Sequence, residues 1–151
     1  YIFISVRHPY TRIVSFWRFA CYNAIALESK AHLTWARLFR EGLPNLEGFI
    51  CFPAMQKAFH RHWRSSWHLE QLPRPVDKVL HFEKLDEINQ IPGLEQLKLP
   101  HKNKGPDCHL AWHEFHTKET LRLVRELWAD DFKLFRYTSD FDACVEGNFF
   151  D

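Results

Sequence analysis

The chain has 151 residues, and its 20 basic and 19 acidic side chains leave a formal charge of only +1. This balance gives no electrostatic support for nucleic-acid binding, so we expect no nucleic-acid partner. Hydrophobic residues make up 46% of the chain and aromatic residues 16%, which excludes disorder and is typical of a packed domain. The longest apolar stretch, Phe49 to Met55, is far shorter than the roughly 20 residues that span a bilayer, so no membrane anchor is expected within this chain.

The first part of the chain is predicted to be a buried strand followed by a helix. Residues 1–6 form a short apolar, β-branched run, which is typical of a strand covered on both faces in a parallel sheet. Pro9 suits the first turn of a helix, and the apolar residues from Tyr10 to about Lys30 have helical spacing. These apolar positions are Ile13, Phe16, Trp17, Ala20, Ala24 and Leu27.

The middle of the chain is predicted to be mainly helical. Residues 34–41 have the pattern of a helix that ends near Gly42. A further helix is predicted over 46–59, with an interruption around Pro53. Residues 60–75 lack clear periodicity, so we predict a loop or a broken helix there.

A second strand is predicted over residues 77–82, followed by short helical turns at 83–90 and 94–97. Two strands separated by about 70 residues of mainly helical pattern indicate an α/β fold. Two strands make an inadequate sheet, and the chain begins inside a predicted strand. We therefore expect residues 1–151 to be one N-terminally incomplete domain, with further strands upstream.

The last third of the chain is predicted to begin with a loop and to continue as a helix. Residues 99–116 contain two prolines and a glycine and lack periodicity, which favours a loop. Thr117 is a suitable N-cap for a helix that runs to about Ala129. The aromatic tail at 131–137 is expected to pack back onto the core.

The first strand–turn–helix unit has the features of an anion site. Arg7 lies at the carboxyl end of the strand, where ligands bind in open α/β sheets, and its guanidinium can bind two phosphate oxygens. The helix after Pro9 would direct N–H groups and its positive dipole end to the same place. Arg12 adds charge, and Ser15 shares its helix face. The alternative is that Arg7 pairs with a core carboxylate and Ser15 is an ordinary helix serine.

The segment Val-Arg-His-Pro-Tyr-Thr-Arg-Ile-Val-Ser at residues 6–15 resembles a motif of sulfotransferases that use 3′-phosphoadenosine 5′-phosphosulfate. The arginine of that motif and the serine eight residues later hold the donor's 3′-phosphate, so the resemblance implies that Arg7 and Ser15 bind the donor. The form of the segment is most similar to the carbohydrate sulfotransferases. The implied fold is a partial P-loop nucleotide-binding-like sulfotransferase fold, with a parallel sheet flanked by helices.

Later segments resemble the family in the same order. They are His-Arg-His-Trp at 60–63, the strand and Glu-x-Leu sequence at 77–87, the basic loop at 99–105, and the aromatic sequence at 124–137. In the basic loop, Lys102 and Lys104 are candidates for contact with the bound nucleotide, with a solvated charged turn as the alternative. Arg12 completes the candidate donor-binding residues.

The chain departs from the family because it lacks the glycine-containing phosphate loop with its lysine. None of the five glycines follows a predicted strand and opens a helix, so we expect that loop upstream. The family's catalytic base also lies mostly before the Arg7 motif, which leaves the catalytic residues of this chain unknown. His62 is a weak candidate base.

A cluster of basic and aromatic side chains is predicted to contact an anionic sugar acceptor, and the alternative is a solvated loop anchored by its tryptophans. Its members are Lys57, Phe59, His60, Arg61, His62, Trp63, Arg64 and Trp67. Glu83 is interpreted either as a carboxylate that orients a positive group or as a cap of the next helical turn. Asp130 and Asp131 are expected to end the last helix and to pair with nearby Arg or Lys side chains.

Zinc binding and disulfides are both disfavoured. Cys108, His109, His113 and His116 match no standard zinc spacing, so we expect no metal site. The four cysteines are widely spaced and are interpreted as buried or incidental thiols.

The resemblance predicts transfer of a sulfuryl group from 3′-phosphoadenosine 5′-phosphosulfate to a hydroxyl, with a carbohydrate as the expected acceptor. Two alternatives remain open. One is a nucleotide kinase-like phosphoryl transferase, which would need a phosphate loop and magnesium-binding carboxylates upstream. The other is a non-catalytic carbohydrate-binding or interaction module.

Overall fold

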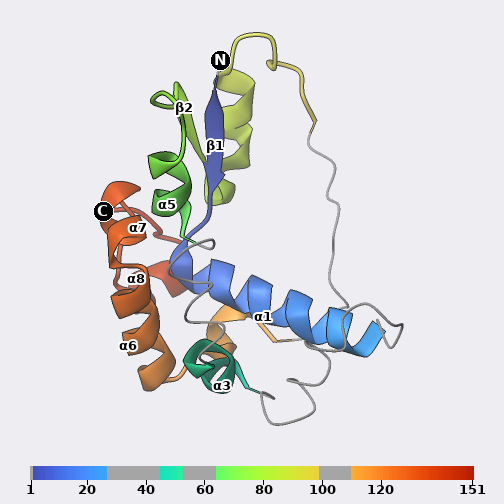
Figure 1. Ribbon diagram of the computed structural model, residues 1–151, viewed down its shortest axis with the longest axis vertical. Coiled ribbons are helices and arrows are strands. Elements are labelled where there is room, and N and C mark those ends of the chain that lie inside the picture. Colours follow the sequence, from blue (N-terminus) through green and yellow to red (C-terminus); the bar gives the residue numbers. More distant parts are fainter. Residues whose placement is uncertain (1, 27–44, 53–63, 99–109) are drawn as a thin grey trace.

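The structure is a computed structural model that describes residues 2–26, 45–52, 64–98 and 110–151 (Figure 1). Strands β1 (Phe3–Val6) and β2 (Lys78–His81) pair in parallel, with Phe3 opposite Lys78 and Val6 opposite His81. Both predicted strands are thus confirmed. Parallel strands combined with helices place the described part of the chain in the α/β class.

The prediction that β1 is covered on both faces is wrong for the described part of the chain. Val6 is buried, whereas Phe3 is 45% exposed and Ser5 is also exposed. The reason is that side chains alternate between the two faces of a strand: the face that carries Ile4 and Val6 packs against the core, whereas no described element buries the face that carries Phe3 and Ser5.

Helix α1 (Pro9–Ala26) begins at the expected proline. Tyr10, Ile13 and Val14 are buried on one face, as the helical spacing predicted. This face packs against α3 (Leu46–Cys51), against the 3₁₀ helix η2 (Trp112–Phe115) and against α6 (Lys118–Leu127). Figure 1 shows the strand pair at one end of the molecule and α1, α3 and α6 toward the other.

The helical predictions are confirmed in part. The expected helix at 46–59 is helical over α3, where Asn45 caps the first turn by accepting the Gly48 N–H at 2.8 Å. Within 60–75, the broken-helix alternative holds, because α5 (Ser65–Glu70) forms there. The predicted helix at 34–41 and the segments 27–30 and 53–63 lie outside the described residues.

The segment after β2 follows the prediction closely. The 3₁₀ helix η1 (Phe82–Gln90) begins directly after β2, whereas residues 94–97 make a single turn closed by the Leu97 N–H to the Leu94 carbonyl at 3.0 Å. Residues 112–115, predicted as loop, form η2 instead, because Trp112 and Phe115 are partly buried against the core.

The C-terminal region contains two short helices that the sequence pattern did not predict. Helix α6 starts after Thr117, whose side chain accepts the Thr120 N–H, and this N-cap is confirmed. Backbone angles at Trp128 (φ −118°, ψ 25°) then separate α6 from α7 (Ala129–Leu134), and α8 (Phe141–Val145) follows. The predicted packing of the tail onto the core is confirmed, because Phe132, Phe135 and Tyr137 are buried.

The break at Trp128 also changes the position of two acidic residues. The prediction that Asp130 and Asp131 end a helix is wrong, because both lie in the first turn of α7, where negative charge is favourable. Their predicted pairing with arginines is confirmed. Asp130 bonds Arg64 at 3.0 Å, and Asp131 lies 3.9 Å from Arg12.

Two further findings concern thiols and membrane spans. Cys21, Cys51 and Cys144 are free thiols, as expected, and Cys108 lies outside the described residues. Burial raises the pKa of Cys21 to about 11 and that of Cys144 to about 12, so both stay protonated near neutral pH. None of the helices in the described ranges is long and apolar enough to cross a bilayer.

Candidate anion-binding site

The candidate site lies at the turn between β1 and α1, at the carboxyl end of the parallel strand pair. Arg7 follows the last residue of β1, and His8 is the N-cap of α1, since its carbonyl accepts the Arg12 N–H at 2.9 Å. Pro9 occupies the first helical position, where its missing N–H costs nothing. The local sequence therefore places Arg7 where the strand ends and the helix begins.

Arg7 is held on one side and open on the other. Its Nε donates to Thr11 Oγ1 at 3.1 Å, and its Cζ lies 4.4 Å from the centroid of the Phe82 ring. The two terminal nitrogens donate to no side chain or backbone group among the described residues. Burial lowers the pKa of Arg7, and the charge of Glu83 opposes that effect. The result is a partly desolvated, oriented guanidinium with two donors available for an oxyanion.

Glu83 supports this turn from the start of η1. Its Oε1 accepts the His8 backbone N–H at 2.9 Å and the Thr11 hydroxyl at 3.3 Å. Its Oε2 accepts the Tyr137 hydroxyl at 3.0 Å, and burial together with Glu83 raises the pKa of Tyr137. Of the two sequence interpretations, the structure favours the carboxylate that orients a positive group, because Glu83 contacts Thr11, the hydrogen-bond partner of Arg7, and attracts Arg7 electrostatically.

Arg12 faces another part of the protein. Its Nη1 donates to Ser65 Oγ and lies 3.9 Å from Asp131. Asp131 accepts the backbone N–H groups of Ser65 and Ser66 at 2.8 and 2.9 Å, so this pair joins α1 to α5 and α7. Burial lowers the pKa of Arg12, with Asp131 opposing and Arg7 adding to the shift. The contacts of Arg12 with Ser65 and Asp131 therefore hold these helices together, and its part in donor binding stays a prediction.

The other predicted site residues are distributed differently. Ser15 is half-buried in α1, one turn beyond Arg12, and its contact with the 3′-phosphate stays a prediction. Lys102, Lys104 and His62 lie outside the described residues, as does most of the basic and aromatic cluster at 57–67. Of that cluster, Arg64 is engaged with Asp130.

An open hollow of about 490 Å³ lies between β1 and α5. Polar groups of Ser5, Arg12, Ser65 and His68 line it together with apolar side chains of β1 and with Leu72. It adjoins Arg12, so a ligand in this hollow would meet one cation and two hydroxyl groups.

His8 is a structural residue that the sequence patterns did not reveal. The side chain is fully buried among aromatic rings, with the Tyr137 ring centroid 4.9 Å away. Nε2 donates to the Thr138 carbonyl at 3.0 Å, and Nδ1 accepts the Tyr10 N–H at 3.3 Å, so the imidazole caps α1. Burial lowers the pKa of His8 to about 4. A signal was present in the sequence, since His8 lies directly between Arg7 and the helix-starting proline.

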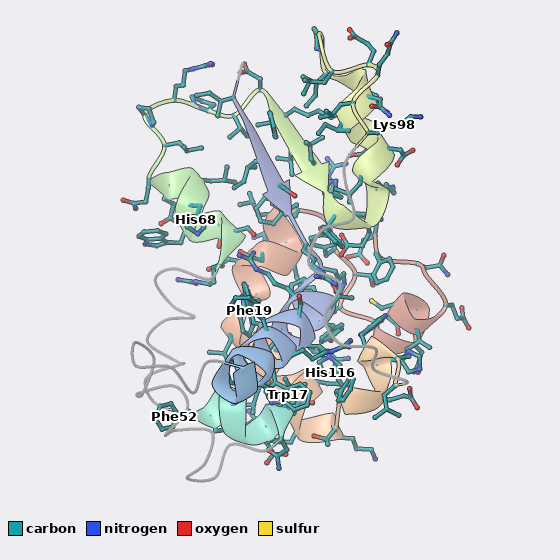
Figure 2. All side chains as sticks on the ribbon, turned by 90° about the vertical axis from the view of Figure 1, so that its right-hand side faces the viewer. Trp17, Phe19, Phe52, His68, Lys98 and His116 are labelled. Atoms are coloured by element: carbon teal, nitrogen blue, oxygen red, sulfur yellow. The ribbon has the colours of Figure 1, made fainter. Side chains whose placement is uncertain are left out.

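His116 is also used inside the fold. Its Nε2 donates to the Tyr10 carbonyl at 3.2 Å and its Nδ1 contacts Thr120 Oγ1 at 3.3 Å, which places it beside α1 (Figure 2). Burial lowers its pKa to about 4. The disfavoured zinc set also contains His113, which the structure describes, and Cys108 and His109, which lie outside the described residues. The described residues contain no group of three or more metal-binding side chains.

Comparison of the chain with protein-family models, with curated proteins and with solved structures gave no match. The features of this chain that bear on function are therefore the geometry of the turn between β1 and α1 and the motif at 6–15.

Proposed function

We propose that this chain is part of a sulfotransferase that moves a sulfuryl group from 3′-phosphoadenosine 5′-phosphosulfate to a hydroxyl of a carbohydrate. The observation that carries the proposal is the position and hydrogen bonding of the Arg7 guanidinium. It is tethered at Nε and keeps two terminal donors available at the carboxyl end of a parallel strand pair. This is the position at which α/β folds bind nucleotides.

The chemistry of the donor fits such a group. Its 3′-phosphate is a dianion that takes no part in bond breaking, so a fixed, always-charged arginine serves to orient it. In the reaction, the acceptor oxygen attacks sulfur and the bond between sulfur and the oxygen of the 5′-phosphate breaks. A base takes the hydroxyl proton. The products are a sulfate ester and 3′,5′-bisphosphoadenosine.

The finer fold assignment belongs to the same proposal. A P-loop-like sulfotransferase fold would supply the phosphate loop and further strands from outside the described residues. The parallel pairing of β1 with β2 and the helix that starts directly after Arg7 support this assignment. The motif resemblance at 6–15 supplies the particular donor, and Ser15, Lys102 and Lys104 remain its further candidate ligands.

A transfer assay tests the proposal directly. The full protein that contains this chain is incubated with donor labelled in the sulfuryl group and with a chemically desulfated glycosaminoglycan. We expect label in the polysaccharide and release of an equal amount of 3′,5′-bisphosphoadenosine. Absence of label from the polysaccharide would contradict the proposal. Transfer of phosphate to the same acceptor in a parallel incubation with ATP as the donor would favour the kinase-like alternative.

A further inference from the structure

We propose that Glu83 is the positioning residue of the anion site: it orients the Arg7 guanidinium through Thr11 and connects the site to the C-terminal segment through Tyr137. The inference rests on the proposed function for the identity of the anion. The contacts that carry it belong to the protein itself.

Arg7 and Glu83 are joined by a hydrogen-bond relay through Thr11. Arg7 Nε donates to Thr11 Oγ1, so this hydroxyl must direct its own proton elsewhere. Its single proton is shared between two acceptors, the His8 carbonyl at 3.1 Å and Glu83 Oε1 at 3.3 Å. Thr11 is only 5% exposed, so water competes little for these bonds. These two acceptors therefore fix the direction of the Thr11 hydroxyl proton, and with it the direction of the lone pair that accepts the Arg7 Nε–H.

Glu83 also holds the backbone beside Arg7. Glu83 Oε1 also accepts the His8 N–H at 2.9 Å, and this N–H belongs to the peptide that follows Arg7. Hydrogen bonds to a carboxylate are roughly twice as strong as neutral ones. One oxygen of Glu83 thus holds both the main chain beside Arg7 and the hydroxyl that receives its Nε.

The orientation of the Glu83 carboxylate is itself supported by Tyr137. Glu83 Oε2 accepts the Tyr137 hydroxyl at 3.0 Å, and Tyr137 is 1% exposed and stacked on Phe150 at 5.3 Å between ring centroids. Phe82, the residue before Glu83, covers the face of the Arg7 guanidinium. The anion site is therefore supported by the β1–α1 turn, by η1 and by the C-terminal segment.

This geometry separates positioning from direct binding. A carboxylate repels an anionic ligand, so Glu83 would help only by holding the cation in place. Glutamine keeps an acceptor oxygen for the His8 N–H and Thr11 while it removes the charge. We therefore expect Glu83→Gln to recover most of what Glu83→Ala loses. Asp86 is an exposed carboxylate on the same helix η1, so Asp86→Ala is the matched control.

The first experiment needs no nucleotide. The side-chain Nε–H proton of Arg7 is observed by NMR in the full protein and assigned by its absence in Arg7→Lys. Its exchange with water should rise about tenfold or more in both Glu83→Ala and Thr11→Val. Thr11→Val removes the acceptor of the Nε–H, and Glu83→Ala removes the carboxylate that holds both this acceptor and the His8 N–H. The rate in Glu83→Gln and in Asp86→Ala should stay near that of the wild type. An exchange rate in Glu83→Ala that equals the wild-type rate would overturn the inference, whatever the rate in Thr11→Val.

The second experiment measures binding of 3′,5′-bisphosphoadenosine by calorimetry. Glu83→Ala and Thr11→Val should each weaken binding about tenfold, and the double variant should lose little more, because both changes break one relay. Additive losses, or unchanged binding in Glu83→Ala when Arg7→Ala binds weakly, would contradict the positioning role. If Glu83→Ala does not fold, Glu83→Met, which keeps the length of the side chain and removes the carboxylate, is measured in its place.

The two experiments separate failure of this inference from failure of the proposed function. The Arg7 Nε–H proton can exchange slowly in a Glu83-dependent way while the protein shows no preference for the bisphosphate. That result would support the positioning role and refute the assigned ligand. A clear bisphosphate preference that is indifferent to both Glu83→Ala and Thr11→Val would support the ligand and refute the positioning role.

Discussion

Mild acid is expected to destabilise this protein because two histidines, His8 fully buried and His116 partly buried, are held in their neutral form. Desolvation lowers the pKa of both His8 and His116 from 6.5 to about 4. Hydrogen bonds to the carbonyls of Thr138 and Tyr10 oppose this shift without cancelling it. The folded chain therefore resists protonation at two positions where the unfolded chain accepts it.

The size of the effect follows from these pKa values. Between pH 6.5 and about 4 the unfolded state binds more protons than the folded state, so the free energy of unfolding falls as the pH falls. Going from pH 7 to pH 5 costs about 2 kcal/mol for each histidine and about 4 kcal/mol for the two together. This is a large part of the roughly 5–15 kcal/mol that stabilises a typical domain.

Urea unfolding followed by tryptophan fluorescence at pH 7, 6 and 5 measures this dependence. His116→Gln keeps one donor and one acceptor but cannot titrate, so about half of the pH dependence should disappear in that variant. A free energy of unfolding that is constant from pH 7 to pH 5 would refute the inference that the folded chain holds both imidazoles neutral.

Three further changes should alter the free energy of urea unfolding at pH 7. Asp131→Ala should cost about 3–5 kcal/mol, because it leaves Arg12 and the N–H groups of Ser65 and Ser66 without their carboxylate. Asp130 is exposed, so Asp130→Ala should change stability by less than about 0.5 kcal/mol. Ile13→Ala should cost about 2–5 kcal/mol because the side chain is fully buried, and Leu134→Ala, 55% exposed, should cost far less. Gly147→Ala should cost about 1 kcal/mol, because φ there is +93° although the space is open. The reverse ranking within either matched pair, or a stabilising Gly147→Ala, would contradict the packing described.

Local signals predicted the order of the elements well. The apolar run before Arg7, the proline at the start of α1 and the threonine cap of α6 each depend on neighbouring residues alone. Such signals are readable in a sequence because the residues that decide them lie within one turn of the helix or strand.

Elements decided by tertiary contacts were not predictable in this way. The break between α6 and α7 occurs at Trp128, a fully buried side chain whose place in the core sets the backbone angles. The same break moved Asp131 into the start of a helix, from which it caps a second helix far away in sequence. The spacing of apolar residues along a helix does not reveal that a side chain from another element caps that helix.

The candidate site shows the same division. Arg7 is recognisable from its place after an apolar strand and before a proline. Its supports, Glu83 and Tyr137, lie 76 and 130 residues further along the chain, so only the fold brings them to it. Glu83 was open to two interpretations from sequence because neither its target nor its distance from Arg7 could be known.

The proposed function depends above all on Arg7 binding the 3′-phosphate of the donor nucleotide. Its most direct test is calorimetric titration of the full protein with 3′,5′-bisphosphoadenosine and with adenosine 5′-phosphate. Arg7→Ala and the exposed control Arg122→Ala are measured beside the wild type. We expect Arg7→Ala to weaken bisphosphate binding by about 2–4 kcal/mol, to change adenosine 5′-phosphate binding far less, and Arg122→Ala to change neither. Equal losses of affinity for both ligands in Arg7→Ala, or no preference for the bisphosphate in the folded wild type, would contradict the assignment of Arg7 to the 3′-phosphate.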